Sequence, residues 1–162
     1  MKFLAHFPWT EAGEPVPTHF YESITKGLFQ TNYGTALAAA GESVGIKKHS
    51  IRRIKDGVPR YGAGMTLHMA ILNMGKETDF AEVECTAVQH AKMYLQPMGD
   101  GYLGYSLCVD VNGRPLSTQQ IKDLARNDGM KPMDFARWFT IDLLLHGTSE
   151  YELVHWTYLR YL

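Results

Sequence analysis

The hydrophobic and polar positions of this chain follow two different periods, which predicts a mixture of strands and helices. In the segment 80–88 polar residues alternate with Val83, Cys85 and Ala87. This period of two places the apolar side chains on one face of a strand and the polar side chains on the other. A further stretch at 92–96 is expected to extend this strand beyond a kink. Four other apolar segments are also predicted to be strands: 2–7, 65–72, 102–111 and 152–159.

Three other segments have the wider spacing of amphipathic helices, and these are 18–30, 117–127 and 131–145. In the second one, Ser117 or the next residue provides a cap, Ile121 and Leu124 face inward, and Gly129 follows as a stop. Helices and strands are mixed without regular alternation. This order favours an α+β fold with a small antiparallel or barrel-like sheet over a doubly wound parallel sheet.

Length and composition indicate one globular domain over residues 1–162. The chain has 162 residues, of which 45% are hydrophobic and 12% aromatic, enough to build a substantial core. A segment rich in alanine and glycine, at about 30–44, is predicted to be an insertion at the surface. Internal repeats and low-complexity linkers are absent from the sequence.

Net charge and cysteine content limit the partners and the cellular compartment that we expect for this chain. The formal net charge is -1, so any nucleic-acid site must be a local patch. The two cysteines, Cys85 and Cys108, are far apart and are predicted to be buried, reduced thiols. Neither a signal-peptide pattern nor an apolar run of about 18 residues is present. We therefore expect a cytoplasmic protein with no membrane partner.

Basic residues cluster in one short part of the chain, at Lys47, Lys48, Arg52, Arg53, Lys55 and Arg60. Alternation in this segment predicts an extended strand in which Lys48, Ser50 and Arg52 point the same way. Charge alone leaves two interpretations open. The cluster is either a solvated basic loop or a surface that meets phosphate groups.

The same segment resembles a known family. Gly45-x-Lys47-x-x-Ser50-x-Arg52 is similar to the ASCH signature, Gly-x-Lys-x-x-(Glu/Thr)-x-Arg. Later stretches also resemble ASCH-like proteins of phages and prophages, namely Arg60-Tyr61, Asn127-Asp128-Gly129 and His155-Trp156-Thr157. ASCH domains are PUA-like β-barrels associated with RNA. The resemblance therefore implies a small, curved β-barrel with helices packed outside and a partner that is RNA, a nucleotide or a modified nucleoside.

Within this group the chain also resembles the small acetylcytidine amidohydrolases, which carry Gly-x-Lys-x-x-Thr-x-Arg and a later Glu-x-Thr-Ala strand. By motif, Lys47 and Arg52 match the lysine and the arginine, Ser50 matches the nucleophilic threonine, and Glu84 matches the glutamate. The resemblance thus implies a catalytic set of Lys47, Ser50 and Glu84. Serine keeps the hydroxyl of the family's threonine but lacks its methyl group, and the insertion at 30–44 has no counterpart in these compact enzymes.

Elementary chemistry is compatible with this set. A hydroxyl needs a base within hydrogen-bond reach, and a lysine can serve if burial and cationic neighbours lower its pKa. Glu84 would then orient Lys47 or pass a proton to the leaving amine. The alternative is equally open: Ser50 is an ordinary strand serine, and Glu84 pairs with Lys47 or Arg52 across the barrel.

Two classes of function follow. One is a non-catalytic RNA- or nucleotide-binding module, in which Lys48, Arg52 and Arg53 meet phosphates and Trp9, next to Pro8, stacks on a base. The other is an amidohydrolase acting on an acylated cytidine, and a ribonuclease is a weaker third possibility. The seven histidines show no metal-binding spacing, so we predict no metal and no cofactor.

Overall fold

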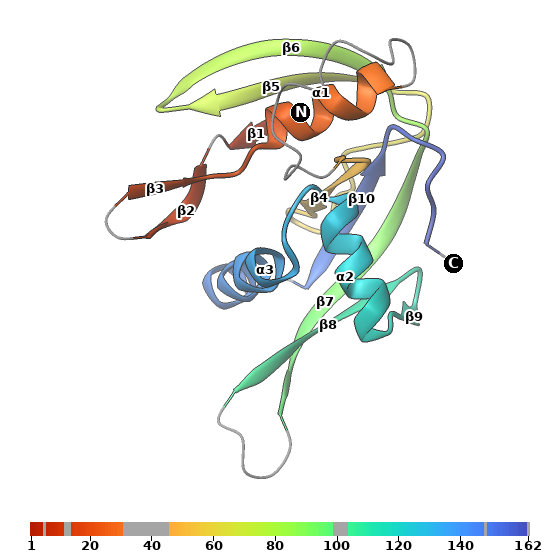
Figure 1. Ribbon diagram of the computed structural model, residues 1–162. Helices are drawn as coiled ribbons and strands as arrows, with labels where there is room; N and C mark the ends of the chain where they lie inside the picture. Colours follow the sequence, from red (N-terminus) through yellow and green to blue (C-terminus); the bar gives the residue numbers. More distant parts are fainter. Residues whose placement is uncertain (5, 12–13, 31–45, 99–103, 148, 162) are drawn as a thin grey trace.

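The computed structural model describes residues 1–4, 6–11, 14–30, 46–98, 104–147 and 149–161, and within them the fold is α+β (Figure 1). This confirms the α+β part of the predicted fold. The predicted insertion at 30–44 lies outside the described residues, except for Gln30, the last residue of the first helix. In the part of the chain that is described, no helix has the length and apolar character needed to cross a membrane.

The largest described sheet has five strands in the order β4-β10-β7-β8-β9, and all neighbours are antiparallel. Its strands are β4 (His49–Arg53), β7 (Ala87–Pro97), β8 (Tyr105–Val111), β9 (Arg114–Pro115) and β10 (Glu150–His155). The register of β4 against β10 places His49 opposite His155, Ser50 opposite Val154 and Arg52 opposite Glu152. The basic segment therefore forms a strand, as its alternation predicts.

A second described sheet has three strands in the order β1-β5-β6, with β1 parallel to β5 and β5 antiparallel to β6. Its strands are β1 (Lys2–Leu4), β5 (Thr66–Asn73) and β6 (Lys76–Glu84). The hairpin of β2 (His6–Glu11) and β3 (Glu14–Pro17) follows β1. The single strand predicted at 2–7 is wrong, because β1 ends at Leu4 and a separate strand, β2, begins at His6 and continues to Glu11.

The predicted strand at 80–88 is also wrong, because the chain changes sheet within it. The Cys85 N–H donates to the Met65 carbonyl, just before β5 of the three-stranded sheet, at 2.8 Å. The next N–H, of Thr86, donates to the His155 carbonyl of β10, also at 2.8 Å. Successive residues thus bond to different sheets, so β6 ends at Glu84 and β7 begins at Ala87.

The helices agree closely with the predicted segments: α1 spans Phe20–Gln30, α2 Thr118–Asn127 and α3 Pro132–His146. Ser117 caps α2, since its hydroxyl accepts from the Gln120 N–H while the Gln120 side chain accepts from the Ser117 N–H. α3 contacts β7 and β8, and α1 contacts β1 (Figure 1). The helices therefore bury the apolar faces of both sheets, with Phe3 of β1, Phe20 of α1 and Trp156 after β10 in one core.

Candidate functional site

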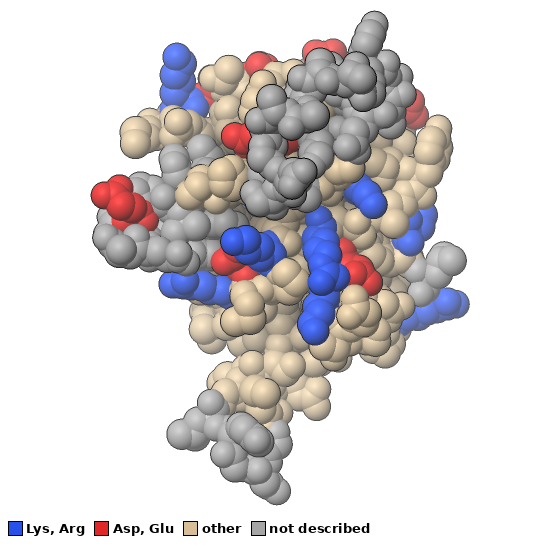
Figure 2. Space-filling view, in the orientation of Figure 1, with Lys and Arg blue, Asp and Glu red and all other residues tan. Residues whose placement is uncertain are grey.

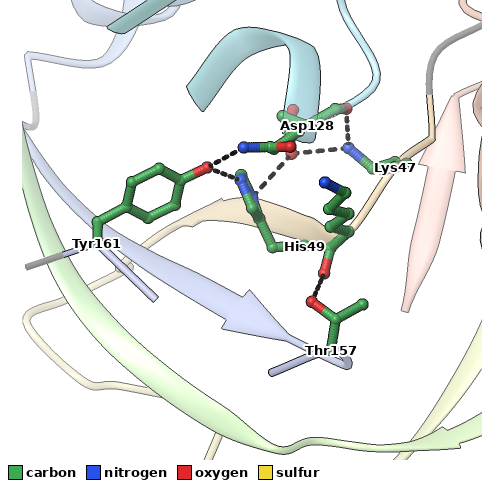
Figure 3. Close-up of polar contacts among 7 residues, drawn as sticks. Lys47, His49, Asp128, Thr157 and Tyr161 are labelled. Carbon is green, nitrogen blue, oxygen red and sulfur yellow. Dashed lines mark hydrogen bonds and ion pairs between the residues drawn. The ribbon is translucent and has the colours of Figure 1, made fainter. Parts of the chain in front are cut away.

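The centre of the candidate site is an ion pair between Lys47 and Asp128, which are 81 positions apart in the sequence. The Lys47 amine donates to Asp128 Oδ1 at 2.7 Å and also to the Asp128 backbone carbonyl (Figure 3). The side chains of Lys47 and Asp128 are only 1% and 4% exposed. A buried pair of this kind is one of the few ways in which a protein accommodates a charged lysine away from water.

Local sequence explains why Asp128 lies here. Helix α2 ends at Asn127, and the Asn127 carbonyl accepts from the Lys48 N–H at 2.7 Å, which ties the helix end to the start of β4. Gly129 follows with a φ of +78°, a conformation that disfavours other residues. A Cβ at Gly129 would lie 3.1 Å from the Cβ of Lys47. The glycine thus lets the lysine stem pack against the chain reversal that presents Asp128.

The Asp128 carboxylate also meets the edge of β4. It accepts a hydrogen bond from the backbone N–H of Ile51, and its Oδ1 lies 3.6 Å from Nδ1 of His49. Strand β4 is the outermost strand in the order of its sheet, so a backbone donor on its outer side needs a partner from elsewhere. Asp128 supplies that partner and at the same time holds the Lys47 amine.

Burial shifts the acid–base balance of both groups toward the neutral forms. Desolvation is the largest cause, and it lowers the pKa of Lys47 to about 8 even though Asp128 opposes the shift; Arg52 lowers it further. Desolvation likewise raises the pKa of Asp128, against the opposing effects of Lys47, Arg52 and the Ile51 N–H. The pair is therefore poised to share or exchange a proton.

Two aromatic rings form a wall beside this pair. The Lys47 amine lies 4.3 Å from the Phe20 ring centroid and 5.7 Å from that of Phe3. The Arg52 guanidinium carbon lies 4.7 Å from the same Phe3 centroid. Two cations from the basic segment thus share one aromatic ring, an arrangement that cation–π attraction stabilises.

Arg52 is incompletely paired within the described residues. Its Nε and Nη2 atoms are buried and have no hydrogen-bond partner there, while the residue as a whole is only half-buried. Glu152, its neighbour across the strands, accepts instead from the Arg60 N–H at 3.1 Å and the Tyr61 N–H at 3.3 Å. Burial lowers the pKa of the guanidinium. One edge of Arg52 therefore retains unused hydrogen-bond donors.

The other two predicted catalytic residues, Ser50 and Glu84, belong to different sheets. Ser50 is 4% exposed and, by strand alternation, shares a face of β4 with Arg52. Glu84 is exposed at the end of β6, opposite Thr66 in the other sheet. Among the described residues, the carboxylate that contacts the Lys47 amine is that of Asp128 and not that of Glu84.

The predicted binding residues have different surroundings. Lys48 is half-buried, and Arg53 donates to Asp142 Oδ1 of α3 at 3.1 Å. Trp9 belongs to β2, but its side chain lies outside the described part of the structure. Figure 2 shows basic side chains across the middle of one face, interspersed with a few acidic ones. This mixture gives a local basic surface in a chain of net charge -1.

A second polar layer adjoins the Lys47–Asp128 pair (Figure 3). The Tyr161 hydroxyl lies 2.9 Å from Nε2 of His49 and accepts from the Asn127 amide at 3.0 Å. The Gln89 side chain donates to the Tyr161 carbonyl at 2.6 Å and accepts from its N–H at 2.9 Å. This layer ties the segment after β10 to β4, β7 and the end of α2.

Asp128, His49 and Tyr161 were not among the predicted site residues. The available signal was the Asn127-Asp128-Gly129 tripeptide, where an acidic residue stands between a helix end and a glycine stop. Within the described residues, no group of three or more histidine, cysteine or acidic side chains is placed to hold a metal ion.

Comparisons with protein-family models, curated proteins and solved structures gave no match to this chain. The ASCH resemblance therefore remains a prediction from the motif.

Proposed function

We propose that this chain is an ASCH-like amidohydrolase acting on an acylated nucleoside such as an acylated cytidine, with Lys47 as the base and Ser50 as the nucleophile. The observation that supports it best is the environment of Lys47. A lysine works as a base only in its neutral form, and burial lowers the pKa of Lys47 to about 8. At neutral pH a useful fraction of the amine is then free to accept a proton.

The chemical steps would be those of acyl transfer. Lys47 takes the proton of the Ser50 hydroxyl as its oxygen attacks the acyl carbon, and the bond from that carbon to the nucleoside nitrogen breaks. Lys47 then returns the proton to the departing nitrogen, which leaves an ester on Ser50 that water hydrolyses. The position of Arg52 on the same face of β4 favours it as the group that meets the polar end of the substrate.

The fold is compatible with this proposal. Two main sheets that join directly at Cys85–Thr86, with helices packed against them, leave room for the PUA-like arrangement that the signature implies. Lys47 and Ser50 are 1% and 4% exposed, so substrate contact requires local opening of the surrounding side chains. Binding at the buried donors of Arg52 also requires such opening, whereas contact with the half-buried Lys48 and Arg53 requires less of it.

The second candidate is a module that binds RNA or a nucleotide without hydrolysis. Arg52 favours it, because the buried edge of its guanidinium has donors without partners among the described residues. A planar guanidinium with free donors suits a phosphate or the acceptor edge of a base. In this case Lys48 and Arg53 would add electrostatic attraction from their half-buried positions.

The deciding experiment measures release of free cytidine from acylated cytidines of several acyl lengths by purified protein. Ser50→Ala is expected to abolish turnover, Ser50→Thr to retain it, and Ser106→Ala, at an exposed serine of β8, to change nothing. Glu84→Gln is included to test the glutamate that the motif predicts. Folded wild-type protein without turnover above background would exclude the hydrolase and leave the binding module.

A further inference from the structure

We infer that Asp128 is the positioning residue of Lys47: it holds the amine in place and controls whether that amine carries a proton. The motif match assigns no role to residue 128: the Gly-x-Lys-x-x-Ser-x-Arg stretch ends at Arg52, and the Asn127-Asp128-Gly129 stretch is matched without a function. For catalysis the inference rests on the proposed function. As a statement about the proton on Lys47, it is independent of any turnover.

Geometry carries the inference. Asp128 uses two separate acceptors on the same amine, its carboxylate Oδ1 at 2.7 Å and its own backbone carbonyl. The carboxylate is in turn fixed by the Ile51 N–H of β4, so it is held by the same strand that carries Ser50. Lys47 therefore has little freedom to rotate, and a rigidly held base is what proton transfer requires.

The electrostatics give Asp128 a second role. The carboxylate stabilises the charged form of Lys47, while burial destabilises the charged forms of both groups. In the molecules where the Lys47 amine is still charged, it can accept the proton of Ser50 only after it has passed its own extra proton on. Asp128 Oδ1 is placed to receive it, so that one proton moves from Ser50 to Lys47 as another is stored on Asp128.

A purely structural role for Asp128 makes a different prediction. Asp128 would then only join α2 to β4, and its loss would reduce stability without changing the titration of Lys47. Asp142 provides a matched control, because it also pairs with a cation of β4: it accepts from Arg53 at 3.1 Å and from the Tyr151 hydroxyl at 2.9 Å.

The test follows the ¹³Cε resonance of Lys47 in protein labelled at lysine, assigned with Lys47→Arg, as the pH is raised. Wild-type protein is expected to titrate near pH 8, well below an ordinary lysine at 10.5. Asp128→Asn should move the midpoint of Lys47 further down, because the stabilising carboxylate is gone. Asp142→Asn should leave it unchanged. An unchanged or higher midpoint in folded Asp128→Asn would overturn the inference.

Two further measurements test the role of Asp128 if the variant does not fold or if the protein shows turnover. If Asp128→Asn does not fold, the wild-type ¹³Cγ resonance of Asp128 must change in the same pH steps as Lys47, since the two groups share the proton, and unrelated midpoints would refute the inference. Where turnover exists, Asp128→Asn should lower kcat at least about tenfold and move its acidic limb to lower pH. Absence of wild-type turnover would count against the hydrolase alone, because the titration of Lys47 still decides the role of Asp128.

Discussion

The imidazole rings of His49 and His155 lie side by side inside the protein, with their centroids 5.3 Å apart. Both residues are fully buried and face each other from neighbouring strands. Burial, and then Arg160, lower the pKa of His155 to about 4. Burial lowers the pKa of His49 well below its usual value, and His155, Lys47 and Lys48 add to this effect. Both rings are therefore neutral at pH 7.

This pair predicts that stability falls as the solution is acidified. A histidine whose folded pKa lies below its unfolded value binds fewer protons when folded, so the free energy of unfolding rises with pH across that interval. For His155 the interval runs from about 4 to 6.5, which corresponds to a loss of about 3 kcal/mol on going from pH 7 to below pH 4. His49 shifts in the same direction. Urea unfolding at a series of pH values measures the slope.

Matched variants identify the source of that slope. His155→Gln should flatten the dependence between pH 4 and 6.5. His90→Gln should not, because His90 is exposed on β7 beside Glu150. Equal slopes in His155→Gln and wild type would show that His155 does not contribute to the pH dependence.

Breaking the Lys47–Asp128 pair from one side should be more costly than removing it altogether. Lys47→Met leaves a buried carboxylate without its cation, and the loss of one partner of a buried pair typically costs about 3–5 kcal/mol. The double variant Lys47→Met/Asp128→Asn leaves no unpaired charge, so it should be less destabilised than the sum of the single variants. Urea unfolding of all four proteins gives the coupling energy. Additive effects would mean that the two side chains do not interact in solution.

Gly129 offers a test of how the site is assembled. Gly129→Ala must adopt a φ of +78° and also places a Cβ 3.1 Å from that of Lys47. Gly113→Ala has the same φ but nothing within 4 Å of the new atom. The backbone conformation alone costs about 1–2 kcal/mol, so both variants should lose this much and Gly129→Ala should lose more. Thermal or urea unfolding measures the free energy of unfolding of both variants. Equal losses would show that the aliphatic part of the Lys47 side chain moves aside at no cost.

The local parts of this fold were predictable and the contacts between distant segments were not. The cap at Ser117 follows from hydrogen bonds three residues apart, and β4 follows from the alternation of its own side chains. The break at Cys85 was missed, because the alternation of residues 80–88 continues smoothly while the hydrogen-bond partners change from one sheet to the other. Local periodicity carries no information about which sheet a strand joins.

The same limit applies to the site. The basic segment and its lysine are visible in the sequence, but the acid that meets Lys47 is 81 positions away. The motif directs attention to Glu84, whereas the structure places that residue at the exposed end of a different sheet. Only the tertiary docking of the end of α2 on β4 identifies Asp128. A short sequence motif can therefore identify one residue of a buried ion pair, but its distant partner is identified only from the three-dimensional structure.

Two donors of Arg52 have no partner among the described residues, and a variant that removes them can separate direct recognition of a nucleotide from general electrostatic attraction. Arg52→Lys keeps the positive charge but removes the planar set of donors, so binding of cytidine monophosphate should weaken at least about tenfold. Arg126→Lys is the control, because Arg126 is exposed on α2 and pairs with Asp123 at 2.8 Å. Titration calorimetry at low and moderate salt measures both variants. The affinity for the nucleotide could instead depend on salt but be the same in Arg52→Lys and wild type. The basic surface would then attract the nucleotide only through its overall charge, and Arg52 would serve only as a structural cation over the Phe3 ring.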